Sequence, residues 1–490
     1  MADEGRHQHN SHHDRHHFLV VAYGVQSHVN PGRVLARRLT RLGVDGSILA
    51  TLSVPVAIHR RMFPSLDGAE ETTDGVISYV PHSDGIDDGS MPKDAQDRER
   101  RRRASFESLS AVVNRLAARG QPVTCVMCTL VQPSVLDVAR EHGVPLALYW
   151  IQPAISLAAN YHYFHGYGEL IASHATDPAY QVSLPGLSRP LRIRDFPSIL
   201  VDTTGSDLAK AFNEVFQELF EYIDTWRPKV LVNTFDELEA TVLKDMKRHL
   251  DVLAVGPMVG SSTEARLHLF KHDDVDEKRY MEWLGAQSDK SVVYVSFGSI
   301  SKYTQQQMEE IVRGLRQCGR PYLLVVRKDG LEEGVDHDDH CLEVVQNQGM
   351  VVEWCNQLEV LSHPAVGCFL THCGWNSTLE AIVSGVPIIG VPNMFDQPTN
   401  AYLVEDEWEI GTRGERNSEG VFTGTELARC IELVMGEYCA KATAIRERVK
   451  ALQGIAQEAA DVGGPAERNL RDFVKTIQAR GTVNCVNNTV

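Results

Sequence analysis

The chain alternates short apolar runs with amphipathic stretches, which is the pattern of a parallel sheet covered by helices. FLVVAY has the length of a strand, and the following GRVLARRLTRLGV places Leu35, Leu39 and Leu42 at helical spacing before the apolar SILAT. The same order recurs in VTCVMCTLV, PSVLDVAREHG and VPLALYW. Strands that alternate with helices predict a parallel sheet with helices on both faces and right-handed crossovers.

A second set of such units follows the segment VGPMVGSSTEARLHLFKHDDVDEKR, which is rich in glycine and charge, as linkers between domains are. SVVYVSF, PYLLVV, MVVEW, GCFLTH and VPIIGVP then alternate with helical sequence, and Thr304 with Gln307 predicts a capping box. Two similar α/β halves joined by a linker predict a cleft between the domains, at the C-terminal ends of the strands.

These patterns set the expected boundaries along the chain. We expect a disordered histidine-rich tail at 1–17, an N-terminal domain at 18–255, a linker at 256–285, a C-terminal domain at 286–462, a helix at 463–482 that packs back on the N-terminal domain, and a frayed tail at 483–490.

The charge and the composition exclude several classes of protein. With 48 Lys and Arg against 65 Asp and Glu in 490 residues, the net charge is −17, which argues against a binder of nucleic acid or of anionic membranes. No apolar run reaches the ~18–20 residues that span a bilayer, and the N-terminus lacks the apolar core of a signal peptide. We therefore expect a cytoplasmic protein without a membrane span, and a monomer.

Cofactor and metal signatures are weak throughout the sequence. Ten cysteines are too few for a disulfide framework, and Cys125 and Cys128 lie in an apolar run that favours a buried strand over a zinc site. No phosphate loop or G-x-G-x-x-G turn follows a strand. The D-x-D matches at 274–276 and 336–338, like the arginine-rich run at 98–103, favour solvated polar segments. We expect no metal and no cofactor.

The stretch from Trp354 to Gln397 holds the densest set of chemical groups. GCFLTH is a strand that ends in His372, and the glycine turn after it leads to the N-terminus of a helix, where backbone N–H groups and the helix dipole favour an anion. His372 and Ser377 flank this turn and are suited to donate to a phosphate, whereas Ser377 together with Glu380 also fits a capping box, S-x-x-E. The spacing alone leaves the phosphate site and the capping box equally open.

This stretch resembles the nucleotide-sugar box of plant family-1 UDP-glycosyltransferases. Its length, 397 − 354 + 1 = 44 positions, is that of the box, and W-C-x-Q, HCGWNS, the Glu three residues after that Ser, GVP and the closing D-Q all match. FLVVAYGVQSHVNPG, WIQPA, VNTFDELE and VYVSFGS extend the likeness through most of the chain. The most similar group contains flavonoid and anthocyanin 5-O-glucosyltransferases and enzymes that form glucose esters of plant acids. The resemblance implies an α/β protein with the GT-B fold, in which two Rossmann-like, doubly wound parallel-sheet domains face each other across a cleft. It also implies UDP-glucose as donor and a role in plant secondary metabolism.

The resemblance also implies roles for individual residues. Trp354 would stack on uracil, Glu380 would bind the ribose hydroxyls, and Asp396 would bind the sugar. The full set implied for UDP is Ser299, Trp354, Cys355, Gln357, His372, Gly374, Asn376, Ser377 and Glu380, and the set for the sugar is Trp375 through its backbone, Asp396 and Gln397. Gln at the last position is usual for members that use glucose. Asn356 stands where the family usually has Pro or Ser, which we expect to be tolerated.

His28 matches the catalytic histidine of the family, in QSHVNP where the usual form is QGHxxP. A phenol with a pKa near ~10 needs a base at neutral pH, and a histidine with a pKa near ~6.5 is suited to take that proton. UDP would leave from the opposite face, so the sugar would invert from α to β without a metal or a covalent intermediate.

At the position of the aspartate that usually orients this histidine stands Thr129. Three hypotheses remain open: Thr129 holds His28 by a hydroxyl hydrogen bond, another carboxylate such as Asp137 takes the place, or the acceptor is a carboxylic acid with a pKa near ~4 that needs little help. Ser27 and Thr129 also leave open a protein that binds UDP-sugar without turnover. The intact His28, Asp396 and Gln397 argue against that.

The acceptor pocket is expected in the N-terminal domain. The residues implied are Trp150, Gln152, Tyr161 and Tyr163, which offer aromatic faces and hydrogen-bond donors to a planar phenol. The alternative is an ordinary amphipathic helix whose aromatic side chains face the core. The main hypothesis is thus an inverting O-glucosyltransferase for flavonoid-type phenols, and its nearest rival is the formation of glucose esters on small carboxylic acids.

Overall fold

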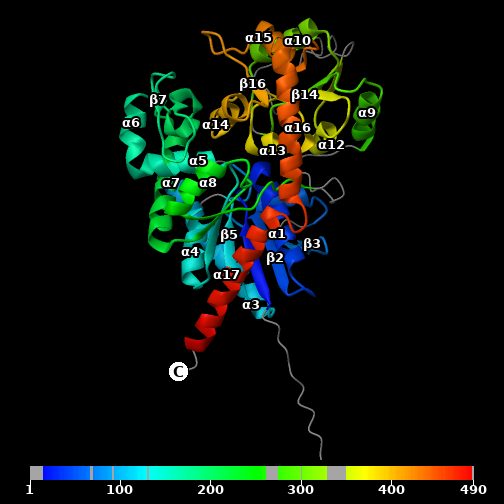
Figure 1. Cartoon of the computed structure of the whole chain (residues 1–490). Coiled ribbons are helices and arrows are strands. Elements are labelled where there is room, and N and C mark those ends of the chain that lie inside the picture. Colours follow the sequence, from blue (N-terminus) through cyan, green and yellow to red (C-terminus); the bar gives the residue numbers. More distant parts are fainter. Residues whose placement is uncertain are drawn as a thin grey trace, which may run out of the picture. The chain divides into compact units, whose positions relative to one another are not determined.

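The structure, a computed structural model, describes residues 15–66, 70–90, 93–129, 132–260, 274–299, 301–327 and 349–487. The chain divides into two compact units: Met1–Leu148 with Leu470–Val490 forms the first, and Tyr149–Asn469 forms the second. Figure 1 traces the chain through its helices and strands. None of the described helices is long and apolar enough to cross a membrane.

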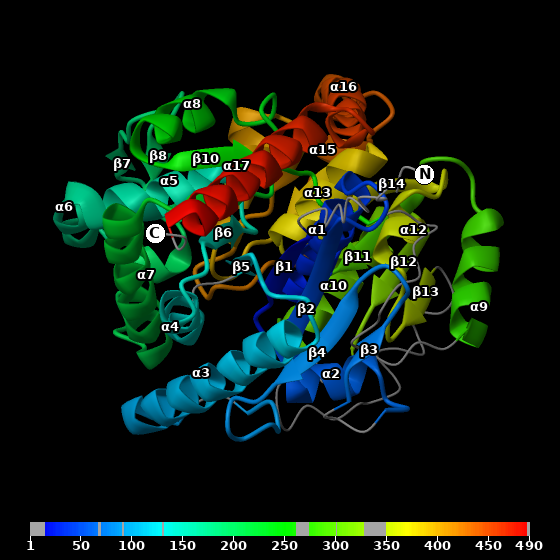
Figure 2. The same cartoon turned by 90° about the horizontal axis from the view of Figure 1, so that it is seen from below.

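The first unit is built on a parallel sheet with the strand order β3-β4-β2-β1-β5-β6, in which the short β3 pairs antiparallel with β4. Its strands are β1 (His16–Val21), β2 (Ile48–Pro55), β3 (Thr72–Thr73), β4 (Ser78–His82), β5 (Cys125–Cys128) and β6 (Leu146–Trp150), which continues into the second unit. Its helices are α1 (Gln26–Leu42), α2 (Val56–Met62), α3 (Ala95–Ala118), α4 (Pro133–Glu141) and α17 (Pro465–Asn487). Figure 2 shows β1, β2 and β4 side by side.

The second unit holds one end of this sheet and a second sheet. From β6 the order continues to β9 and β10, and a separate parallel sheet has the order β13-β12-β11-β14-β15-β16. The strands are β7 (Gln181–Val182), β8 (Leu191–Arg192), β9 (Lys229–Val232), β10 (Asp251–Ala254), β11 (Val292–Ser296), β12 (Tyr322–Val325), β13 (Gly349–Val352), β14 (Val366–Thr371), β15 (Ile388–Gly390) and β16 (Gly411–Arg413).

Helices connect these strands, as the alternating pattern predicts. They are α5 (Ala154–His162), η1 (Tyr163–Tyr167), α6 (Gly168–Ser173), η2 (Ile193–Asp195), η3 (Ser198–Leu200), α7 (Asp207–Trp226), α8 (Ala240–His249), α9 (Asp274–Gly285), α10 (Gln305–Cys318), α12 (Gln357–Leu361), α13 (Trp375–Ser384), α14 (Gln397–Tyr402), η5 (Leu403–Glu407), α15 (Gly424–Met435) and α16 (Ala440–Ala460). The strands of the second sheet bury continuous apolar runs on both faces, as β11 does with Val292, Val293, Tyr294 and Val295.

Each sheet has a point at which the strand order reverses. β1 pairs with β2 on one side and β5 on the other, and β11 pairs with β12 on one side and β14 on the other. In open α/β sheets, ligands bind beyond the carboxyl ends of the strands at such a point. The segments there are 22–28 and Thr129 in the first unit, and 297–299 and 372–374 in the second.

Several expected boundaries differ from the structure. β1 already begins at His16, because His17 is buried and binds Gln121 O and Thr51 Oγ1, so the last residues of the expected tail belong to a strand. The end of the expected linker is the helix α9, and α17 continues to Asn487 into the segment expected to fray. Residues 1–14, 261–273 and 488–490 lie outside the described residues, as does the D-x-D match at 336–338.

Candidate active site

His28 lies in the first turn of α1, and its ring contacts Thr129, which follows β5 directly. Its Nδ1 is 3.1 Å from the backbone oxygen of Thr129 and 3.1 Å from the Thr129 hydroxyl, which accepts a bond from Tyr23 N. A carbonyl oxygen only accepts, so Nδ1 carries the hydrogen of this bond and the lone pair lies on Nε2. Thr129 thus fixes the tautomer that leaves Nε2 able to take a proton.

Burial sets the charge of His28. It lowers the pKa of the imidazole to about 4, an effect that the bond to the Thr129 carbonyl opposes in part. His28 is therefore neutral at physiological pH and available as a base.

Asp137, the carboxylate considered as an alternative orienting partner of His28, is instead bound to an arginine. It accepts two hydrogen bonds from Arg102 of α3, at 3.0 and 2.9 Å. Arg101, the neighbour of Arg102, is buried and pairs with Asp84 and Asp97. Glu99, Arg100 and Arg103 are exposed, so the predicted solvated face holds for these residues of the arginine-rich run and not for Arg101. The geometry favours the first of the three hypotheses, in which Thr129 itself holds His28.

In the second unit, the turn after β14 leads directly into α13. Gly374 precedes the helix, and the first intrahelical bond runs from Thr378 N to Gly374 O at 3.0 Å, so the N–H groups of residues 375–377 come before the helical ladder. Within the described residues, no side chain caps this helix. Ser377 lies inside the helix rather than before it, so the capping box was the wrong reading. The open helix N-terminus is suited to a diphosphate.

His372 lies against this turn. A Cβ at Gly298 or at Gly374 would come within 2.5 Å of its ring, so both glycines are required for the two loops to close around it. Burial, reinforced by the positive charge of Arg327, lowers the pKa of His372 to about 4. The ring is thus a neutral hydrogen-bond donor at pH 7. Arg327 also donates to the backbone oxygen of Ser299 and so holds the neighbouring loop.

Gln357 joins the residues expected to bind the nucleoside. Its Nε2 donates to Ser377 Oγ at 2.9 Å and to Glu380 Oε2 at 2.7 Å, and its Oε1 accepts from the Tyr294 hydroxyl at 3.4 Å. That hydroxyl also lies 3.2 Å from Cys355 Sγ. The hydrogen bonds from Gln357 of α12 to Ser377 and Glu380 of α13 bring these three side chains into one site.

The two residues that flank Cys355 in the box also have clear places. Trp354 is partly buried at the end of β13. Asn356 accepts a bond from Glu359 N and so caps α12, which explains physically why Asn is accommodated there.

The expected sugar-binding residues lie at the start of α14. Asp396 is buried, its Oδ2 accepts from Asn400 Nδ2 at 2.8 Å, and burial raises its pKa to about 6. Gln397 Oε1 accepts from Asn393 N and Met394 N, which leaves the NH₂ group of its amide to donate elsewhere.

The Trp375 indole does not compete for this role. Its Nε1 donates to Asn233 O at 2.7 Å, so its backbone N–H is the group that remains for a ligand.

The expected acceptor residues divide into two kinds. Trp150 and Gln152 are partly exposed at the end of β6, and the Trp150 indole donates to Pro153 O. Tyr161 is 9% exposed, stacks on His165 with ring centres 3.9 Å apart and contacts Phe220. This packing favours the core alternative for Tyr161. Tyr163 is partly exposed in η1.

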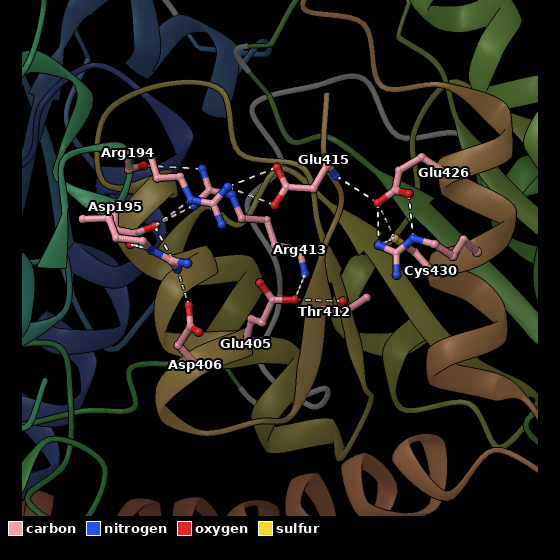
Figure 3. Close-up of polar contacts among 11 residues, drawn as sticks. Arg194, Asp195, Glu405, Asp406, Thr412, Arg413, Glu415, Glu426 and Cys430 are labelled. Carbon is pink, nitrogen blue, oxygen red and sulfur yellow. Dashed lines mark hydrogen bonds and ion pairs between the residues drawn. The ribbon is translucent and has the colours of Figure 1, made fainter. Parts of the chain in front are cut away.

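A cluster of charges that the sequence analysis did not find holds α14, the helix at whose start the expected sugar-binding residues lie. Asp195 is fully buried, and its carboxylate pairs with Arg413 at 2.8 Å (Figure 3) and with Arg192. Its backbone oxygen accepts from Thr399 Oγ1 at 2.7 Å. Thr399 belongs to α14, two residues after Gln397. The only signal in the sequence was a carboxylate among arginines in LRIRDF, and no spacing linked it to β16.

Replacing Asp195 by Asn is expected to destabilise the protein strongly. The change leaves the guanidinium of Arg413, which is 12% exposed, without its anion, and breaking such a buried pair lowers the free energy of unfolding by about 3–5 kcal/mol. Glu415→Gln is the matched control, because its pair with Arg194 is exposed and contributes under about 1 kcal/mol. Urea unfolding measures both. An equal loss of unfolding free energy in the two variants would contradict a stabilising role of the buried ion pair between Asp195 and Arg413.

Comparison with known proteins decides the family. The family model "UDP-glucoronosyl and UDP-glucosyl transferase" matches residues 261–447. "Crocetin glucosyltransferase, chloroplastic" of Gardenia jasminoides is 39% identical over 475 residues, 94% of this chain and 97% of that protein. The chain belongs to the UDP-glycosyltransferase family. It is also similar to "Phloretin 4'-O-glucosyltransferase" of Malus domestica, with 38% identity over 95% of this chain and 98% of that protein.

Solved structures confirm the fold. Os79 from O. sativa in complex with UDP matches with a TM-score of 0.78 and 29% identity over 94% of this chain and 100% of that chain. A UDP-glucosyltransferase from Polygonum tinctorium, capable of glucosylating indoxyl, matches with a TM-score of 0.77 and 25% identity over 95% of this chain and 99% of that chain. The predicted family, the GT-B fold and the assignment as a glycosyltransferase enzyme are confirmed.

Proposed function

We propose that this UDP-glycosyltransferase transfers glucose from UDP-glucose to a hydroxyl group of a small aromatic acceptor, with inversion and with His28 as general base. The observation that carries the proposal is the bond from His28 Nδ1 to the Thr129 carbonyl, which directs the basic Nε2 away from Thr129. Relatives named for the glucosylation of phloretin, and for the 5-O-glucosylation of anthocyanidin 3-O-glucosides, support a phenolic acceptor.

In the proposed reaction, the acceptor oxygen forms a bond to the anomeric carbon while the bond from that carbon to UDP breaks. The acceptor proton passes to His28 Nε2, and the electron pair of the broken bond leaves with UDP. The N-terminus of α13 and the neutral His372 stabilise the charge that develops on the diphosphate. Attack opposite to the leaving group converts an α-linked glucose into a β-glucoside.

The low pKa of His28 determines whether the proton can be transferred before the acceptor oxygen attacks the anomeric carbon. A phenol with a pKa near ~10 differs from an imidazole with a pKa of about 4 by about six units, or ~8 kcal/mol for complete transfer before attack. The acceptor oxygen becomes far more acidic as it bonds to carbon. We therefore propose that proton transfer and C–O bond formation are concerted.

The formation of glucose esters is the second candidate, and the same observation favours it. The groups that fix His28 are a carbonyl and a hydroxyl instead of a carboxylate, so within the described part of the chain no anion is shown to support a protonated imidazole. A carboxylic acid with a pKa near ~4 is ionised at neutral pH and attacks without a base.

Mass-detected turnover of UDP-glucose tests the proposal, with one panel of phenols and one panel of aromatic carboxylic acids. The proposal expects phenol β-glucosides, identified by the anomeric proton coupling in NMR. Products from acids alone would favour the ester reaction. UDP binding without any product would favour a binding protein over an enzyme for these acceptors. Metal independence, a monomeric state and a cytoplasmic location stay predictions.

Lowering the pH is expected to change the KM for UDP-glucose and kcat to different extents. Because Asp396 has a pKa raised to about 6, its carboxylate is protonated below that pH, and the KM for UDP-glucose is expected to rise as the pH falls from 7 to 5. His28, with a pKa near 4, stays neutral over this range, so kcat is expected to stay nearly constant. Initial rates between pH 5 and 8 measure both. A fall of kcat centred near 6.5 would contradict the account of His28.

A further inference from the structure

Asn400 links two segments of the site proposed for UDP-glucose. It lies in α14, its side chain is fully buried, and its Nδ2 donates to Cys373 O and to Asp396 Oδ2, both at 2.8 Å. A carbonyl oxygen and an ionised carboxylate only accept hydrogen bonds, so the NH₂ group must face both of them. The two hydrogens of one amide thus join the turn after β14 to the carboxylate that precedes α14.

The backbone of this turn is held in an unusual conformation at Cys373. Its φ of +63° is in the left-handed region, which a residue with a side chain adopts only when the surroundings impose it. The Cys373 side chain is fully buried, and a Cβ at Gly390 would lie 2.5 Å from its sulfur. The packing of the sulfur and the bond from Asn400 to the carbonyl together hold Cys373 directly before Gly374 and α13.

The bond from Asn400 also affects the ionisation of Asp396. Burial raises the pKa of Asp396 to about 6, and this hydrogen bond opposes the rise because it stabilises the ionised carboxylate. Without the bond, the pKa of Asp396 is expected to lie higher still. Asn400 therefore influences both where the carboxylate lies and over which pH range it is charged.

The other titratable groups near α14 do not take over this effect. Burial raises the pKa of the Cys373 thiol to about 12, so the thiol stays uncharged near neutral pH. The charged side chains on the elements that pack against α14 have partners of their own: Asp195 with Arg413 (Figure 3), Asp406 with Arg192, Arg194 with Glu415, Glu405 with Thr412, Glu407 with Ser188, and Glu380 with Gln357. Within the part of the chain that the structure describes, Asn400 is thus the side chain that stabilises the charged form of Asp396.

We propose that Asn400 is a positioning residue for UDP-glucose, whose amide fixes the Asp396 carboxylate at one distance from the turn 372–374. The proposal rests on the proposed function, in which Asp396 binds the glucose and the N-terminus of α13 binds the diphosphate. Because Asn400 is fully buried, it acts through these two groups and not by contact with the ligand.

The test is the Kd of UDP-glucose, measured by calorimetry between pH 5 and 8.5 without an acceptor. In the wild type, Kd is expected to rise about tenfold as the pH falls through a midpoint near 6, where Asp396 becomes protonated. Asn400→Leu removes both donors at a similar volume. Its midpoint is expected to lie about one to two pH units higher, the size of a hydrogen bond to a charged group. Asn400→Ala, a second variant without donors, is expected to shift the midpoint in the same direction.

Asn160→Leu is the matched control. Asn160 is a buried asparagine of α5, and its Nδ2 also donates to a backbone oxygen, that of Ser156 at 2.8 Å. In both asparagines the amide oxygen is buried without a partner among the described residues. The control is expected to lose stability in urea unfolding and to keep the midpoint of the wild type.

Two results would overturn the proposal: an unchanged midpoint in both Asn400 variants, which would mean that the residue serves packing alone, or an equal shift in Asn160→Leu. A wild-type Kd that does not vary with pH would refute the proposed role of Asp396 on the sugar, and the proposal for Asn400 with it. The measurement contains no acceptor, so a failure of phenols to react would refute the proposed acceptor class and leave the result for Asn400 standing.

Discussion

His28→Ala is expected to lower kcat/KM for phenolic acceptors by roughly 100- to 10,000-fold, the range that a positioned general base contributes. The variant removes Nε2, which the bond from Nδ1 to the Thr129 carbonyl leaves as the basic atom of the ring. The residues expected to bind UDP lie on other elements, so the Kd for UDP, measured by calorimetry, is expected to stay within about twofold of the wild type.

His17→Ala is the matched control for this variant. His17 is also buried, its Nδ1 also binds a backbone oxygen, that of Gln121 at 2.9 Å, and burial also lowers its pKa. It lies at the opposite end of β1 from the segment that leads to His28. The control is expected to lose stability but to keep kcat/KM per folded molecule. Similar losses of kcat/KM in the two variants would show that His28 matters only for folding.

Asp396→Ala is expected to weaken the use of UDP-glucose while leaving the binding of UDP intact. Hydrogen bonds to a charged group contribute about 1.5–3 kcal/mol, so losing the carboxylate is expected to lower kcat/KM for UDP-glucose by about 10- to 150-fold. The inhibition constant of UDP, which has no sugar, is expected to change less than twofold. Product assays under both conditions measure the difference. Parallel losses for UDP-glucose and UDP would contradict a role on the sugar.

The alternation of apolar and polar positions was sufficient to predict the strands whose ends form the candidate site. SVVYVSF and GCFLTH were predicted as strands and form β11 and β14, and the reversal of strand order between them places His372 at the carboxyl edge. Thr304 and Gln307 were predicted to form a capping box: Thr304 Oγ1 does accept from Gln307 N, but the Gln307 side chain bonds the backbone of Phe422 instead. These features depend on local spacing, which the sequence records directly.

Contacts between distant segments could not be predicted in the same way. Ser377 and Glu380 have the spacing of a capping box, but their partner is Gln357 on another helix. Asp195 binds Arg413 across 218 positions of the chain, and two reciprocal hydrogen bonds join Phe395 to Ser198. No periodicity encodes such pairs, because they depend on how the strands and helices pack.

The central claim is that His28 takes the proton of the acceptor, and a series of substituted phenols with pKa values from about 7 to 10 tests it most directly. The measurement is log kcat/KM against the pKa of the phenol, for the wild type and for His28→Ala. If His28 is the base, the loss in the variant grows with the pKa of the phenol, so the variant line is the steeper one. Two parallel lines, with the same loss for the most and the least acidic phenol, would contradict the account.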